Sequence, residues 1–341
     1  MVLKNYRTLT STQSYDGTAS TQVTDLPRDF LIQRILLDFQ GTTVLSGTSV
    51  LVQDALLQCV TAIRVKAVGE GSSRTIFDVK GNDLYYMNLF DYGFGTALTN
   101  TDTAAATYTQ KTAFTIDMRI NKQDPDDFSV AIPSYLLSTL QLEIEYNTSA
   151  LGYGTNVGSQ SFTMGITLIE GIPQASEDFS ANPLLTTLTK TLNADASTGD
   201  EDFDTFWQVG ALIRRAFTYV EDSSGNPSDT EIADYTVKSG QIPLMSKINY
   251  RANKTKDIEN YRIAETVNPT LAALDGFSHW DVLGYFCIDF ANNQQPFIPT
   301  ASGLKIDGLS TVGYNVGDLK QTFNFNNASS VVRRIQETVE G

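Results

Sequence analysis

The sequence reads as two halves that carry similar strand-like segments in the same order. A duplication with so long a period indicates two related domains rather than a solenoid of short repeats. The spacing between counterparts drifts along the chain, because loops gain and lose residues while strands are retained. The matched pairs are Ile32-Gln33-Arg34-Ile35 with Ile213-Arg214-Arg215-Ala216, Val65-Lys66-Ala67 with Tyr250-Arg251-Ala252, Phe114-Thr115-Ile116-Asp117 with Phe286-Cys287-Ile288-Asp289, Glu145-Tyr146-Asn147 with Gly313-Tyr314-Asn315, and Gln160-Ser161-Phe162 with Gln321-Thr322-Phe323.

The composition favours strands over helices. Hydrophobic residues make up 41% of the 341 residues and charged residues only 18%. The polar share is therefore carried by Ser, Thr, Asn, Gln and Gly, which disfavours coiled coils, helical repeats and disorder. Several apolar runs have strand length, and residues 113–120 alternate at period two. Two antiparallel β domains of this size make a jelly-roll sandwich the first candidate and an immunoglobulin-like pair the second.

Composition shifts along the chain predict five segments. The C-terminal segment has Val331, Val332, Ile335 and Val339 at helical spacing, which predicts a short amphipathic helix. Short helices are expected in loops as well. The predicted segments are an N-terminal arm over 1–27, a first jelly roll over 28–172, a linker over 173–204, a second jelly roll over 205–328 and the C-terminal helix over 329–341.

The charge balance argues against direct nucleic-acid binding. The chain has 24 Lys and Arg against 39 Asp and Glu, a net charge of −15, and the first residues hold no basic cluster. The N-terminus shows no secretory signal, so we expect folding in the cytosol. Cys59 and Cys287 are far apart in sequence, and we expect two reduced core thiols, with an interdomain bridge as an unsupported alternative.

The sequence predicts no catalytic residue, no cofactor and no metal site. His279 is the only histidine, so the usual nucleophile–base pairs and two-histidine metal sites are unavailable, and a turn is the favoured role for this residue. The acidic clusters at 124–127 and 200–204 have enough oxygens for calcium but lack the EF-hand order, which favours solvated loops. A carboxylate pair brought together by folding stays open, and with it a glycan-cleaving sandwich.

The order of the paired segments, including Ile32-Gln33-Arg34-Ile35 and Phe114-Thr115-Ile116-Asp117, resembles a known architecture over residues 28–327. The chain is similar to the double jelly-roll major capsid proteins of tailless icosahedral viruses, which include adenovirus hexon and the capsid proteins of membrane-containing bacterial and archaeal viruses. The resemblance implies an all-β fold of two successive jelly rolls and a homotrimer of pseudo-hexagonal outline that tiles an icosahedral shell. It also implies location in the virion, with neighbouring capsomers and minor capsid or vertex proteins as partners.

The capsid interpretation places the C-terminal segment on the inner side of the shell. Without a basic arm, an internal membrane or minor proteins are more plausible inner partners than the genome. Arg333 and Arg334 are then the candidates for an inner-face, membrane-proximal contact, while a cap on the second domain is the favoured alternative role of the predicted helix. Two other functions stay open: a β-sandwich that binds or cleaves glycans, and a phage fibre or adhesin module, for which shorter repeats would be expected.

Overall fold

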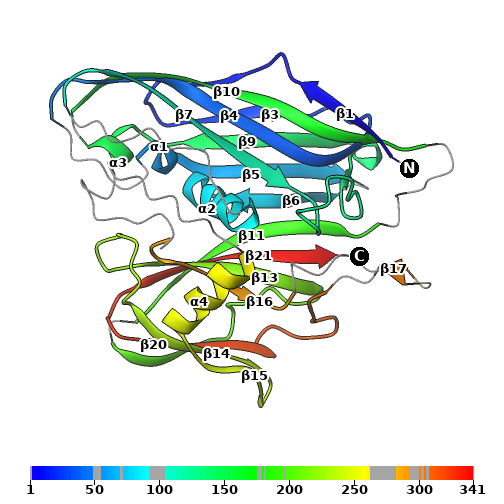
Figure 1. Ribbon diagram of the computed structural model, residues 1–341, viewed down its shortest axis with the longest axis vertical. Helices are drawn as coiled ribbons and strands as arrows, with labels where there is room; N and C mark the ends of the chain where they lie inside the picture. The colour runs from blue at the N-terminus through cyan, green and yellow to red at the C-terminus, as the bar shows by residue number, and fades with distance from the viewer. Residues whose placement is uncertain are drawn as a thin grey trace. The chain divides into compact units, whose positions relative to one another are not determined.

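The chain folds as two compact units, Met1–Leu185 and Thr186–Gly341, each built mainly from strands (Figure 1). The boundary between them falls inside the predicted linker. The computed structural model describes residues 2–48, 55–69, 72–92, 104–154, 156–174, 179, 182–195, 197–261, 282–291, 299–300, 303–304 and 307–340. Within this described part, no helix is both long and apolar enough to cross a membrane.

The first unit contains two antiparallel sheets. One has the strand order β1-β10-β4-β7, with β2 beside β10 and β8 beside β4, and the other has the order β6-β5-β9-β3. The elements are β1 (Leu3–Thr8), β2 (Gln13–Tyr15), β3 (Ser20–Asp25), β4 (Leu31–Leu45), α1 (Ala55–Gln58), β5 (Val60–Gly69), β6 (Ser72–Val79), α2 (Gly81–Tyr92), β7 (Thr107–Asp117), β8 (Ile132–Pro133), the 3-10 helix Ser134–Leu136, β9 (Thr139–Tyr146), α3 (Ala150–Tyr153) and β10 (Val157–Ile172).

The pairing in the first unit is nested, which defines a jelly roll. Strand β1 pairs with β10, β3 with β9, β4 with β7, and β5 with β6, all antiparallel. Early strands therefore lie beside late ones, and the chain winds inward until β5 and β6 form a hairpin. This first unit confirms the predicted fold class.

The second unit repeats the same winding. Its sheets have the orders β16-β13-β21-β11 and β12-β20-β14-β15, so β11 pairs with β21, β12 with β20, β13 with β16, and β14 with β15. The elements are β11 (Leu184–Asn193), β12 (Gly199–Phe203), β13 (Leu212–Glu221), β14 (Ile232–Ser239), β15 (Ile242–Asn249), α4 (Tyr250–Tyr261), β16 (Tyr285–Asp289), β17 (Pro299–Thr300), β18 (Gly303–Leu304), β19 (Leu309–Ser310), β20 (Leu319–Phe325) and β21 (Val331–Glu340).

Aromatic side chains fill the core of each unit. Buried and partly buried residues alternate along β9 and β20, as expected for strands with one face on a core. In the first unit Tyr15 stacks on Tyr146 with ring centroids 5.0 Å apart, and Phe39 lies 4.9 Å from Phe162. In the second unit the ring centroid of the fully buried Phe323 lies 5.3 Å from that of Phe206. Such pairs add specific geometry to the area that they bury.

Three of the predicted segments differ from the structure. The C-terminal helix is wrong, because residues 331–340 form strand β21, which lies between β13 and β11 in the middle of a sheet. Eight consecutive residues of β21 are buried, and a strand buried on both faces does not alternate. The predicted arm over 1–27 contains β1, β2 and β3, which belong to the first jelly roll, and the predicted linker contains the whole of β11 and β12.

Candidate functional site: a helix-to-strand corner in both units

Each unit carries a helix of 12 residues at the same place in its winding. Helix α2 follows β6 and precedes β7, whereas α4 follows β15 and precedes β16 (Figure 1). The last residue of each helix is a tyrosine, and the last residue of the strand that follows is an aspartate. Tyr92 donates to Asp117 Oδ2 at 2.6 Å, and Tyr261 donates to Asp289 Oδ2 at 2.6 Å. We call this contact between the end of the helix and the end of the following strand the corner. It is duplicated together with the fold.

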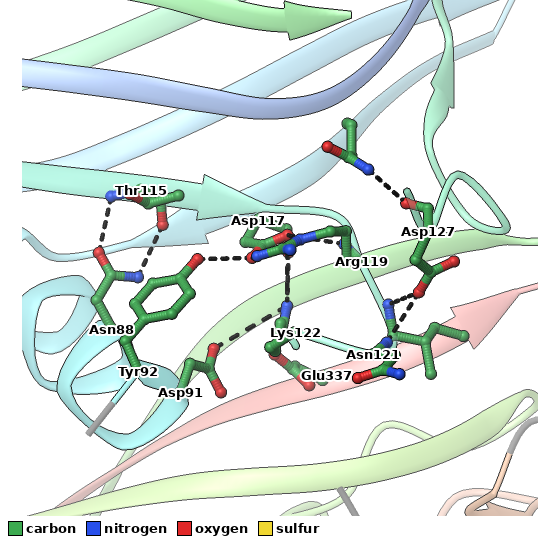
Figure 2. A network of polar contacts seen from close by, with 12 residues as sticks. Asn88, Asp91, Tyr92, Thr115, Asp117, Arg119, Asn121, Lys122, Asp127 and Glu337 are labelled. Atoms are coloured by element: carbon green, nitrogen blue, oxygen red, sulfur yellow. Dashed lines mark hydrogen bonds and ion pairs between the residues drawn. The ribbon is translucent and has the colours of Figure 1, made fainter. Parts of the chain in front are cut away.

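In the first unit the corner also holds an amide clamp (Figure 2). Asn88 lies one turn before Tyr92 on α2, and its Oδ1 accepts from the Thr115 backbone N–H at 2.7 Å. Its Nδ2 donates to the Thr115 carbonyl oxygen at 2.8 Å. One side chain thus satisfies both backbone groups of a residue on β7. Because buried backbone groups need partners, this clamp fixes the position of α2 along the strand.

Ionised groups surround the end of β7 (Figure 2). Asp117 accepts from the Arg119 backbone N–H at 2.9 Å and from its guanidinium Nη2 at 2.7 Å. Lys122 donates to the Asp117 carbonyl oxygen at 2.8 Å, and its Nζ lies 4.0 Å from an oxygen of Asp91. Burial by itself would raise the pKa of Asp117. The charge of Lys122 and the hydrogen bonds from Arg119 outweigh burial, and the pKa is lowered below its ordinary value.

In the second unit a carboxyl replaces the clamping amide. Asp257 lies one turn before Tyr261, and its Oδ2 accepts from the Cys287 backbone N–H at 2.8 Å. The Cys287 carbonyl oxygen accepts instead from Asn253 Nδ2 at 3.0 Å. Asp289 Oδ1 accepts from the backbone N–H two residues later at 2.8 Å, as Asp117 does in the first unit. The geometry is the same in both units, but the chemistry is more ionic in the first.

A β-bulge completes both corners. The register of β4 against β10 shifts at Gln33, and the register of β13 against β21 shifts at Arg214. The carbonyl oxygen of each bulged residue accepts from the first backbone N–H beyond the neighbouring strand, at 2.9 Å in both units; the donors are Met118 and Phe290. A bulge bends a strand and turns its backbone groups. Here it directs a carbonyl oxygen toward the residue that follows β7 or β16.

The predicted site residues Arg333 and Arg334 lie on β21 and are buried. The exposed fractions are 2% for Arg333 and 3% for Arg334. Arg333 forms an ion pair with Glu221 and lies over the Tyr219 ring, 4.1 Å from its centroid. Arg334 donates to the Phe206 carbonyl oxygen, and burial lowers its pKa to about 10. The expectation of a lipid-facing helix with these arginines on it is therefore corrected: both side chains are held by partners of their own unit.

The acidic cluster at 124–127, the two cysteines and His279 are the other residues of interest in the sequence. Asp127 Oδ2 accepts from the backbone N–H groups of Ile120 and Asn121 at 2.9 and 2.8 Å, so this acidic cluster organises a turn. Among the described residues, no three His, Cys, Asp or Glu side chains are grouped as metal ligands. Cys59 and Cys287 are buried free thiols. His279 lies outside the described residues.

Sequence reasoning missed the corner, although two signals for it were present. Asp117 and Asp289 end two of the matched segments, and β7 and β16 do occupy the same place in the two units. A second signal precedes these strands, where Tyr92 and Tyr261 end two helices of equal length. Neither helix has its apolar side chains gathered on one face, so hydrophobic periodicity does not identify these helices from the sequence.

Comparison with known proteins identifies the fold. No protein-family model matches the chain, and no curated protein matches it in sequence. The crystal structure of the STIV major capsid protein matches 98% of this chain and 97% of its own, with a TM-score of 0.73 and 17% identity. The major capsid protein P2 of bacteriophage PM2 matches 99% and 98%, with a TM-score of 0.60 and 11% identity.

A third match comes from another virus capsid. The quasi-atomic model of the PBCV-1 virus capsid matches 99% of this chain and 94% of its own, with a TM-score of 0.61 and 8% identity. All three likenesses extend over both units. The nested strand pairing and these likenesses agree, and they confirm the predicted architecture: this chain has the fold of two successive jelly rolls that these viral capsid proteins have.

Proposed function

We propose that the chain is a viral major capsid protein, a structural protein rather than an enzyme. The observation that carries this proposal is the likeness to the STIV major capsid protein over nearly the full length of both chains. A fold alone can serve many functions. Here, however, the matched feature is a specific succession of two jelly rolls, and the three matched structures described above are all capsid structures.

The proposed assembly unit is a homotrimer. Three chains with two similar units each place six similar jelly rolls around the trimer axis. A trimer of this kind has the pseudo-hexagonal outline that tiles a flat lattice. Exposed apolar side chains are available for contacts between copies. Four of them lie on edge strands: Leu3 and Tyr6 on β1, and Ile242 and Leu244 on β15. Exposed edges of this kind favour association.

The proposed partners follow from the charge. With a net charge of −15, the chain repels nucleic acid on average, so we place an internal membrane and minor capsid or vertex proteins inside the shell, without direct genome contact. Neighbouring capsomers are the lateral partners. The site of action is the virion, after synthesis in the host cytoplasm. The buried Arg333 and Arg334 play no part in this proposal.

Native mass tests the proposed assembly unit. The purified chain is measured by light scattering after gel filtration at low and at high salt. A species with three times the chain mass of 37.4 kDa at both salt concentrations supports the trimer. A double variant, Ile242→Asp with Leu244→Asp, tests whether the β15 edge takes part in the contacts between copies. The variant Leu3→Asp tests the β1 edge in the same way. A monomer of 37.4 kDa under all conditions would contradict the proposed capsomer.

A further inference from the structure

The second-unit corner contains a buried carboxyl with an unused oxygen. Asp257 is 2% exposed, and its Oδ2 accepts two hydrogen bonds, from the Cys287 backbone N–H at 2.8 Å and from Asn253 Nδ2 at 3.0 Å. Its Oδ1 has no hydrogen-bond partner among the described residues. An ionised carboxylate with a bare buried oxygen is costly, whereas a carboxylic acid needs less solvation.

The first unit provides an internal reference for this position. Asn88 occupies the equivalent place on α2 and is a neutral amide whose two ends are both hydrogen-bonded to Thr115. A neutral side chain is thus sufficient to dock the helix on its strand. Asp257 keeps the acceptor role of that amide, while Asn253 takes over the donor role toward the Cys287 carbonyl oxygen. A protonated Asp257 would reproduce the neutrality of the first-unit corner.

The charged groups around Asp257 do not neutralise an anion there. On its own helix, Lys256 and Lys254 both favour the ionised form, and Lys254 is ion-paired with Asp229. On β16, the charge of Asp289 disfavours ionisation. On β13, Arg215 forms a bidentate pair with Glu337. On β14, Tyr235 directs its hydroxyl to Asn253 Oδ1 at 2.8 Å.

Burial dominates the balance of these effects. It raises the pKa of Asp257 to about 7, against the opposing contributions of the Cys287 N–H, Lys256 and Lys254. We propose that Asp257 is a neutral carboxylic acid while α4 is docked on β16, and that its ionisation weakens this docking, which makes α4 a proton-sensitive latch of the second unit. On ionisation the O–H bond breaks and the proton passes to solvent water. The inference does not depend on the capsid role.

The pH dependence of unfolding tests the latch. The sequence of the first unit contains no tryptophan, whereas Trp207 is buried in the second, so tryptophan fluorescence during urea unfolding does not report the first unit in the full-length chain. One proton bound in the folded state but released on unfolding makes the unfolding constant rise about tenfold per pH unit. We expect this slope between pH 5 and 6.5 in the wild-type chain, and its loss in Asp257→Asn. The control Asp200→Asn changes an exposed carboxyl on β12 and should keep the wild-type slope.

A second measurement needs no variant. Infrared spectra of the chain with isotopically labelled aspartate should show a protonated carboxyl band at pH 6 that disappears above pH 8. An Asp257→Asn slope equal to that of the wild type would overturn the proposal, and so would a wild-type spectrum at pH 6 without that band. Neither result would bear on the native mass, so failure of the latch and failure of the capsid proposal are distinguishable.

Discussion

The hydroxyl of Tyr92, at the end of helix α2, donates to Asp117 Oδ2, at the end of strand β7, across 2.6 Å. The same bond of the same length joins Tyr261 and Asp289 in the second unit. Duplicated domains usually keep their strands and vary their loops. Here a polar contact outside the strand pairing is kept as well, which indicates that fixing this helix to this strand matters for both units.

Removing the Tyr92 hydroxyl should destabilise the first unit. In Tyr92→Phe, the buried Asp117 loses one donor but keeps Arg119, so we expect a loss of about 1–2 kcal/mol in the free energy of unfolding. Urea unfolding followed by circular dichroism measures the change. Tyr108→Phe is the matched control, because its hydroxyl bond is exposed and its loss should cost less than about 0.5 kcal/mol. Equal effects of the two variants would refute a special role for the corner.

The first unit should lose stability in acid through Asp117. Its pKa is lowered in the folded state, so its stabilising contribution is complete above the ordinary aspartate pKa of about 3.9 and is lost as pH falls through the folded value. In Arg119→Met the folded pKa rises, and the loss should begin at a higher pH than in the wild type. Acid titration by circular dichroism measures both onsets.

A control variant on the same strand separates this effect from the general loss of a cation. Lys111 is exposed on β7, and Lys111→Met should leave the acid onset unchanged. If Arg119→Met and Lys111→Met shift the onset equally, the ion pair at the corner does not control the acid response.

Two glycines on paired strands should respond differently to alanine. A Cβ at Gly41 on β4 would lie 2.0 Å from the Ser161 carbonyl oxygen, a backbone atom that cannot move independently of β10. A Cβ at Gly165 on β10 would come no closer than 3.8 Å to Asp38. We expect Gly41→Ala to lower the free energy of unfolding by about 1–3 kcal/mol. We expect Gly165→Ala to change it by less than about 0.5 kcal/mol. Thermal unfolding of both variants decides, and similar melting temperatures would argue against close approach of β4 and β10 at Gly41.

Deleting residues 331–340 should prevent the second unit from folding. The segment is strand β21, which pairs with β13 along nine registered positions and places Ile335 in the core. A peripheral C-terminal helix could be removed with little effect on the fold, whereas an inner strand cannot. Loss of cooperative tryptophan fluorescence unfolding is the expected result. A truncated chain that still unfolds cooperatively would show that β21 is dispensable.

The duplication in sequence was sound evidence for the fold, but only part of the alignment was right. The segments beginning at Ile32 and Ile213 do lie on equivalent strands, β4 and β13, and those beginning at Phe114 and Phe286 lie on β7 and β16. Both pairs contain features that the corner requires, namely a bulge and a terminal aspartate. The other three pairs do not lie on equivalent strands, and residues 313–315 lie outside any strand.

The mismatched pairs illustrate the limit of pattern reasoning. Residues 250–252 begin helix α4, although their counterparts lie on strand β5. Residues 321–323 lie on β20, whose equivalent by pairing is β9 and not β10. Strand order depends on long-range pairing, and burial of Arg333 and Arg334 depends on neighbours distant in sequence. Local periodicity contains neither kind of information.

Electron microscopy of the purified oligomer tests the proposed capsid role. If the chain is a major capsid protein, single-particle images should show a pseudo-hexagonal ring in which three copies contribute two jelly rolls each, and concentrated samples should form flat or closed lattices of these rings. Particles that contain one copy only, with no lattice at any concentration, would contradict the account.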